Sequence, residues 1–169
     1  MSAIVDLYFR GLKFLVAALL AGMVVLVFGN VVMRYVFDSG ITVSEELARW
    51  FFVWMVFLGA IVGLREHAHL GIDTLLRVLS PTGRRVCFAL SHGLMIFASL
   101  LLIRGSWVQT LINWNVTAPA TGLSVGLFYG IGIVFGVSAV AILSWELGRV
   151  LTGRATDEEL IGVRESEEH

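Results

Sequence analysis

The sequence predicts an all-α integral membrane protein with four transmembrane helices in a single domain. Hydrophobic residues make up 57% of the 169 residues and charged residues only 15%, and the mean hydropathy is +0.86. A soluble domain of this size requires a more polar surface. The charges also cluster between four long runs that contain none. A helix of about 20 such residues crosses the roughly 30 Å hydrocarbon core of a bilayer.

The charge-free runs predict where the spans lie. Phe14–Met33 has 20 residues, Val86–Ile103 has 18 and Val116–Trp145 has 30, so these runs reach or nearly reach the required length. Trp50–Leu64 has only 15, but charged residues on the same predicted helix can extend their long side chains to the interface. We therefore predict spans at about residues 12–36, 45–65, 85–106 and 122–147, within a domain of residues 1–155 that precedes a polar cytoplasmic tail at 156–169.

The twelve lysines and arginines predict the orientation of the spans. Nine of them precede the first span, follow the fourth, or lie between the second and third. Arg34, Arg49 and Arg104 lie on the other side, each at a predicted helix end. Because basic residues mark the cytoplasmic side of a membrane, both termini are predicted to be cytoplasmic.

The cytoplasmic connection between the second and third spans has a helical pattern of its own. Leucines and an isoleucine are interleaved with His69, Asp73 and Arg77 at about residues 67–80, before Pro81 interrupts the pattern. This pattern predicts a short amphipathic helix, which lies either in the membrane interface or as a loop helix against the spans.

Small and aromatic residues indicate how the spans pack and where they are anchored. Glycines four residues apart allow two helices to approach closely in a membrane. The candidate contacts, within the chain or with another protein, are Trp50, Trp54, Gly59, Gly63, Gly126, Gly130, Gly132 and Gly136. Trp107 and Trp114 follow the third charge-free run and are predicted to anchor the protein at the bilayer surface.

Polar residues gather at the predicted outer ends of the first two spans. Ser44 is placed to cap the second span, whose positive N-terminus favours the acidic residues that follow. The cluster is predicted either to pair internally, closing the helix hairpin, or to bind another protein. Its members are Asn30, Arg34, Glu45, Glu46 and Arg49.

Ionisable residues are almost absent from the interior of the spans. His92 is the one ionisable side chain that we place clearly inside a span, and a lone histidine there more often donates a hydrogen bond than binds haem or a metal. With a net charge of −1 and no basic face, the chain is not expected to bind nucleic acid. We predict no enzymatic activity and no catalytic, substrate-binding, metal or cofactor site in this chain.

An ordered set of motifs runs through the first half of the chain. The set comprises Asn30–Phe37 (NVVMRYVF), Ser44–Arg49 (SEELAR), Phe52-Val53-Trp54 with Phe57–Ala60, and then Arg65, His69 and Asp73. This set resembles the small membrane (DctQ-like) subunit of TRAP (tripartite ATP-independent periplasmic) transporters. It covers about residues 27–75, and the predicted length, span number and orientation agree with the family. Val43 stands where the family often has tryptophan, and Ser124 and Ile133 stand where prolines are common.

The resemblance implies a subunit of the bacterial inner membrane with two protein partners. One is a large permease subunit that carries the substrate and sodium sites and moves the substrate by an elevator motion. The other is a periplasmic binding protein that delivers an organic anion. The small subunit is expected to act as a scaffold among membrane lipids and to help dock the binding protein. The nearly uncharged spans agree with that role, because a substrate-moving element needs broken helices or buried polar groups.

Three other functions fit parts of the sequence. A generic membrane anchor or assembly protein fits the spans but not the ordered motifs. A small membrane cytochrome using His92 needs a second histidine inside the membrane. A small multidrug exporter needs a membrane-embedded acidic residue, and the first predicted span has none.

Overall fold

The computed structural model describes residues 3–66 and 81–152, which form four long helices. They are α1 (Ala3–Val36), α2 (Thr42–Arg65), α4 (Pro81–Ile112) and α5 (Val125–Leu151). All four are long and apolar enough to cross a membrane, which confirms the predicted all-helical fold with four spans. The predicted amphipathic helix at 67–80 and the tail at 156–169 lie outside the described residues.

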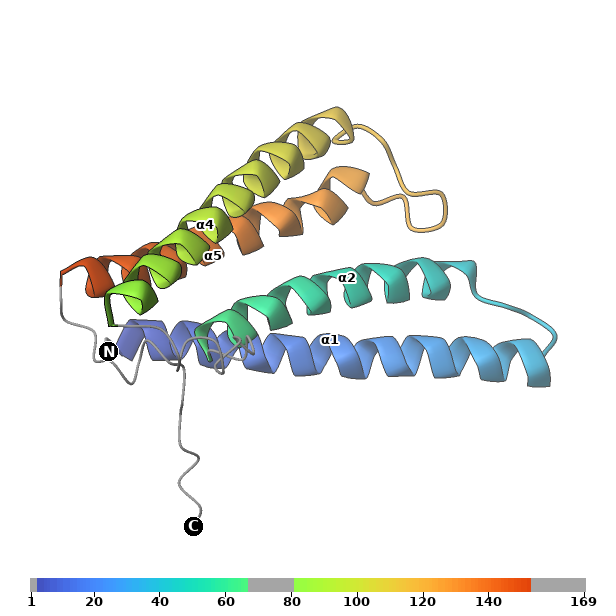
Figure 1. Cartoon of the computed structure of the whole chain (residues 1–169). Coiled ribbons are helices and arrows are strands. Elements are labelled where there is room, and N and C mark those ends of the chain that lie inside the picture. The colour runs from blue at the N-terminus through green and yellow to red at the C-terminus, as the bar shows by residue number, and fades with distance from the viewer. Residues whose placement is uncertain (1–2, 67–80, 153–169) are drawn as a thin grey trace, which may run out of the picture.

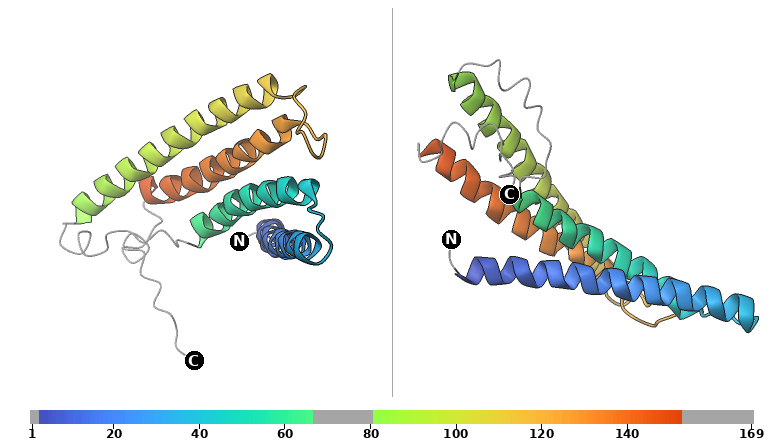
Figure 2. Two further views of the ribbon diagram at one scale, coloured as in Figure 1. Left: turned by 90° about the vertical axis from the view of Figure 1, so that its right-hand side faces the viewer. Right: turned by 90° about the horizontal axis from the view of Figure 1, so that it is seen from below.

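The four helices lie side by side in an open row, in the order α1, α2, α5, α4 (Figures 1 and 2). The main contacts join α1 to α2, α2 to α5, and α5 to α4. The neighbours within each hairpin are antiparallel, whereas α2 and α5 run in the same direction. The chain therefore forms a layer instead of a closed bundle, and α1 and α4 are the edges of that layer.

The two ends of the layer differ in the segments that they carry. The connections at residues 37–41 and 113–124 both lie at one end, which we call the loop end (Figure 1). α1 begins and α5 ends at the opposite end, which we call the terminal end. Each hairpin thus has its turn at the loop end, as expected for four consecutive spans.

The start of α2 differs from the sequence prediction. Ile41 occupies the N-cap position without a side-chain hydrogen bond, and the helix begins at Thr42. The predicted capping role of Ser44 is therefore wrong, because Ser44 already lies in the first turn. Its hydroxyl instead donates to the carbonyl oxygen of Leu26 in α1, at 2.7 Å. The side chain thus joins the two helices of the hairpin.

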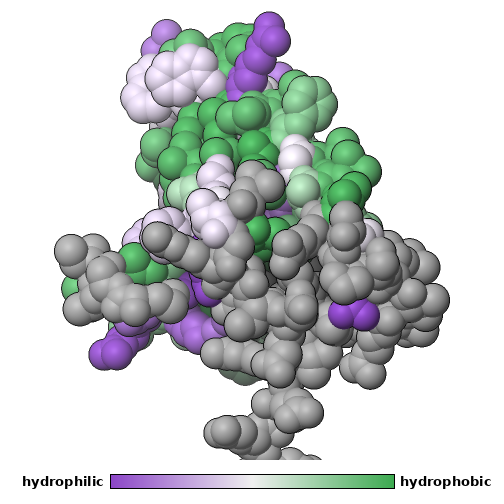
Figure 3. All heavy atoms as spheres, turned by 60° about the vertical axis from the view of Figure 1, so that its left-hand side comes forward, coloured by the Kyte–Doolittle hydropathy of each residue, from purple (hydrophilic) through white to green (hydrophobic). Residues whose placement is uncertain are grey.

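The core lies along the seam between α2 and α5. Leu58 and Ile61 of α2 are buried against Ile131 of α5, and Phe57 meets Phe135 edge-on with ring centroids 5.6 Å apart. Only 6% of the most apolar window of α1 and 28% of that of α5 are buried within the chain. Most of the apolar surface is thus left for lipid or another protein. Figure 3 shows this surface on one face, with hydrophilic residues toward its ends.

Candidate functional site

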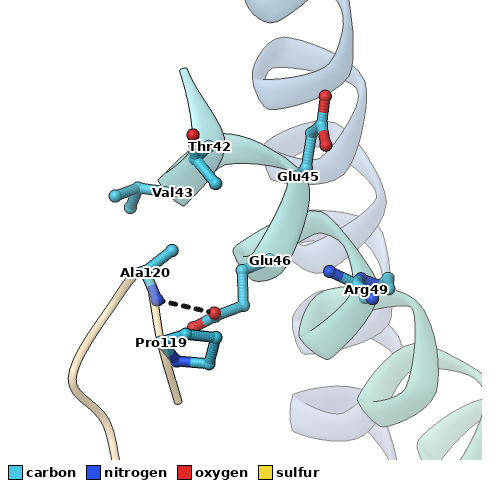
Figure 4. Close-up of a pocket in the computed structure, with 7 residues that line it drawn as sticks. All are labelled: Thr42, Val43, Glu45, Glu46, Arg49, Pro119 and Ala120. Atoms are coloured by element: carbon cyan, nitrogen blue, oxygen red, sulfur yellow. Dashed lines mark hydrogen bonds between the residues drawn. The ribbon is translucent and has the colours of Figure 1, made fainter. Parts of the chain in front are cut away.

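Glu46 is a buried carboxylate that connects the two hairpins at the loop end. It lies near the start of α2 and is only 6% exposed. Oε2 accepts a hydrogen bond from the backbone N–H of Ala120 at 3.0 Å, and Oε1 accepts one from that of Thr121 at 3.1 Å. The hydroxyl of Thr121 donates to Oε1 as well. One carboxylate thus satisfies three donors of the α4–α5 loop, and bonds to a charged acceptor are among the stronger ones in proteins. Figure 4 shows the bond from the N–H of Ala120.

The α4–α5 loop presents these donors because it folds back on itself. Thr117 and Ser124 form an antiparallel bridge, and the N–H of Ala118 donates to the carbonyl oxygen of Leu123 at 2.8 Å. Gly122 has a φ of +70°, a conformation that side chains rarely adopt, so the turn requires glycine there. The two N–H groups before Gly122 are thereby aimed at Glu46.

A second set of hydrogen bonds fastens the turn between α1 and α2. Asn30 is buried, and its Oδ1 accepts from the backbone N–H of Ile41 at 2.7 Å. Its Nδ2 donates to Oε1 of Glu45 at 3.0 Å. Three members of the predicted polar cluster, namely Asn30, Glu45 and Glu46, thus make internal hydrogen bonds, and they do so in two separate sets.

The two arginines of the predicted cluster face outward. Arg34 and Arg49 are exposed, and neither forms a hydrogen bond or an ion pair with another described residue. Arg49 lines an open pocket of about 360 Å³ together with the side chain of Glu45. The full lining, drawn in Figure 4, is Thr42, Val43, Glu45, Glu46, Arg49, Pro119 and Ala120. At the loop end, exposed basic side chains therefore lie beside segments that internal hydrogen bonds hold in place.

The structure divides the predicted glycine contacts into two groups. A Cβ at Gly126 would come within 2.9 Å of the carbonyl oxygen of Thr110, and one at Gly132 or Gly136 would collide with α4 side chains. These three glycines are used inside the chain, at the α4–α5 seam. A Cβ at Gly59 or Gly130 would meet nothing within 4 Å. Gly63 is half-buried.

The predicted tryptophans also fall into two groups. Trp50 is half-buried and packs edge-on against Phe128 of α5, with centroids 5.8 Å apart, and Trp54 packs against the core cluster. Trp107 and Trp114 are exposed, near the loop-end part of α4. Anchoring of these two tryptophans at the bilayer surface remains a prediction.

The terminal end contains an ionisable pair that the sequence does not predict. The sequence predicts only His92 clearly inside a span, but Glu146 also lies inside the fourth span, Val125–Val150. Its Oε2 is 3.2 Å from Nε2 of His92, and Nδ1 of His92 is 3.1 Å from the carbonyl oxygen of Phe88. Both ring nitrogens therefore have protein partners, and the pair ties α4 to α5. In the sequence, Glu146 directly follows the fourth charge-free run. Its pairing with His92 becomes visible only when the register of α5 against α4 is known.

A further set of ionic contacts joins α1 to α2 at the terminal end. Arg65 donates to Oδ1 of Asp6 at 2.7 Å and lies 4.0 Å from the centre of the Phe9 ring. Lys13 forms an ion pair with Glu66. Within residues 3–66 and 81–152, no three side chains of His, Cys, Asp or Glu gather in a way that could hold a metal ion.

Comparison with known proteins identifies one family. The family model for the DctQ component of tripartite ATP-independent periplasmic transporters matches residues 23–153. The chain is 39% identical over 134 residues to a putative TRAP transporter small permease protein of Haemophilus influenzae, covering 79% of this chain and 83% of that protein. A second such protein of the same organism is 30% identical, covering 82% and 84%. The C4-dicarboxylate TRAP transporter small permease protein DctQ of Vibrio cholerae is 35% identical, covering 56% and 41%.

Proposed function

Because the chain belongs to the DctQ family of small permease components of tripartite ATP-independent periplasmic transporters, we propose that it is the membrane scaffold of a large transporting subunit. The complete transporter is proposed to import an organic anion with sodium coupling, using sodium and substrate sites in the large subunit. A periplasmic binding protein delivers the anion. The chain is proposed to lie in the bacterial inner membrane, with both termini in the cytoplasm as the distribution of its basic residues predicts.

The observation that carries the scaffold role is the continuous course of all four described spans. A subunit that binds and moves its substrate inside the membrane is typically built with helices that break near the midplane. Here α1, α2, α4 and α5 each run uninterrupted through the candidate span, and Glu46 fixes the two hairpins to each other. A rigid layer with large apolar surfaces is suited to holding a moving partner.

The scaffold proposal predicts that the chain acts only within a complex. When it is co-expressed with its large permease subunit, the two should co-purify in mild detergent. In proteoliposomes with an inward sodium gradient and the binding protein outside, anion uptake should require both membrane subunits. Uptake by the large subunit alone at the rate of the full set, or failure of the two membrane subunits to co-purify, would contradict the proposal.

We further propose that the loop end helps dock the binding protein through Arg34 and Arg49. The support is their exposure at the end of the layer where the internal hydrogen bonds hold the surface rigid. Exposed charges of this kind steer and orient an encounter more than they contribute to affinity. An acidic patch on the binding protein would complement them.

The docking proposal predicts a specific defect in the R34Q/R49Q variant. The variant should still co-purify with the large subunit, but half-maximal uptake should need about tenfold more binding protein. R10Q removes a charge from an exposed arginine at the terminal end of α1 and serves as the control. Unchanged dependence on binding protein in R34Q/R49Q, or an equal defect in R10Q, would remove these arginines from the docking surface.

A further inference from the structure

We propose that the exposed face of α4 around Arg104 binds the large permease subunit, and that a carboxylate of that subunit pairs with Arg104 inside the membrane. The existence of this partner rests on the proposed function. The choice of face and the chemistry of the contact come from this chain alone, namely from the depth, the exposure and the surroundings of Arg104.

Arg104 lies deeper in a span than the sequence predicted. The sequence predicts a helix end at Arg104, because this residue directly follows the third charge-free run. α4 instead continues without interruption to Ile112. The residues from 105 to 112 add about 12 Å of helix beyond Arg104 at 1.5 Å per residue. The candidate span Val86–Ile112 therefore includes Arg104. The prediction that Arg104 lies at the edge of the membrane is wrong.

The packing of the neighbouring helices gives the same depth. Ile103 and Ser106, on either side of Arg104, contact Gly136 and Gly132 of α5. The Phe135 ring at that level of α5 packs on Phe57 of α2. Phe57 is close to the middle of α2's charge-free run. Arg104 thus lies at the level of the interior of three spans and not at the loop end of the layer.

No described residue compensates the charge of Arg104. Its side chain is exposed and forms no hydrogen bond or ion pair with the residues at 3–66 and 81–152. Among the described helices, α4 packs mainly on α5, and none of the other described helices covers its opposite face. The exposed residues that share a stripe with Arg104, three or four positions apart, are all apolar: Leu90, Leu94, Phe97, Leu101, Val108 and Leu111.

A charged group in this position requires a partner. Ionisable residues within a span normally face protein or water and are paired, because hydrocarbon does not solvate them. A lipid phosphate is the competing partner, reached by extension of the side chain toward the nearer membrane surface. The nearer end of α4 is its C-terminus, at Ile112, whereas helical side chains lean toward the N-terminus. Arg104 therefore leans toward the middle of the membrane.

The chemistry of arginine favours a carboxylate as that partner. The planar guanidinium presents parallel N–H donors that match the two oxygens of a carboxylate, and the pair is strongest where water is absent. A continuous apolar stripe on both sides of the charge supplies the packing surface that a partner helix needs. We therefore assign the occupant as a membrane helix of the large subunit that carries an aspartate or glutamate.

A photocross-linking experiment tests the face while leaving Arg104 intact. A benzophenone amino acid is placed at Val108, one turn from Arg104, and in a second variant at Val25, on the exposed surface of the opposite edge helix α1. In the co-expressed complex, the probe at Val108 should cross-link to the large subunit more efficiently than the probe at Val25. Cross-links from Val108 to lipid only would overturn the proposal, whatever other variants do.

A substitution tests the charge. R104L should accumulate in the membrane at least as well as the wild type when expressed alone, since it removes an unsolvated charge. Its yield of complex should nevertheless fall at least about tenfold, because a carboxylate of the partner is left unpaired. R104K should retain most of the complex, and R10L should match the wild type. Undiminished complex with R104L would overturn the pairing, whereas a wild-type chain that never co-purifies would instead refute the proposed function.

Discussion

Replacement of Glu46 by alanine is expected to release the α4–α5 loop and to destabilise the layer at the loop end. The carboxylate accepts two backbone hydrogen bonds and one hydroxyl hydrogen bond from Ala120 and Thr121. Hydrogen bonds to a charged group contribute more than neutral ones, and the loss of this acceptor leaves three donors without it. We therefore expect the free energy of unfolding to fall.

Hydrogen exchange of the purified chain in detergent measures this effect at the site itself. The amides of Ala120 and Thr121 should exchange much faster in E46A than in the wild type, and the apparent Tm should fall. E45A is the matched control: Glu45 is the preceding acid, but it accepts a single hydrogen bond, from Asn30, and it is exposed. E45A should leave the loop amides protected. Equal protection of these amides in E46A and the wild type would show that the carboxylate does not hold the loop.

The sequence predicts the four spans well because a span depends on local composition. A helix of about twenty apolar residues makes its backbone hydrogen bonds internally and is as long as the hydrocarbon core of the bilayer is thick, wherever it occurs in a chain. The lengths of the helices are less predictable. α4 passes beyond Arg104 to Ile112 because no glycine turn or proline stops it before the loop, and one charge is not enough to end a helix.

The partners of the polar residues depend on which helices are neighbours, and the sequence does not encode that arrangement locally. Glu46 was placed with Asn30 and Arg34, its neighbours across the first turn. In the structure it reaches Ala120 and Thr121, which are more than seventy positions away, because α2 packs beside α5. The same reason hides the pair of His92 and Glu146. Glycine spacing indicated close packing, but only the helix register shows which glycines serve the α4–α5 seam.

Substitution of Gly136 by leucine is expected to force α4 and α5 apart. Any Cβ at this position would collide with the Ile103 side chain and would lie 3.3 Å from the carbonyl oxygen of Ser99. Overpacking of this kind typically costs about 1–3 kcal/mol, and occasionally more, because neighbouring side chains and backbone must shift. The apparent Tm of the chain in detergent should fall accordingly. The contact between His92 and Glu146, about 15 Å further along α5, should weaken as well if the separation extends along the seam, since it joins the same two helices.

Gly130, on the same helix, provides a control at which substitution is expected to raise stability instead of lowering it. No heavy atom lies within 4 Å of a Cβ built there. G130A should therefore leave the seam intact and raise stability slightly, by about 0.5–1 kcal/mol, because alanine is a better helix former than glycine. If G136L and G130L lowered the apparent Tm equally, a general effect of the larger side chain, such as altered detergent contact, would explain the loss. A selective loss in G136L requires that α4 and α5 approach each other at Gly136, which is also the contact that places Arg104 deep in the membrane.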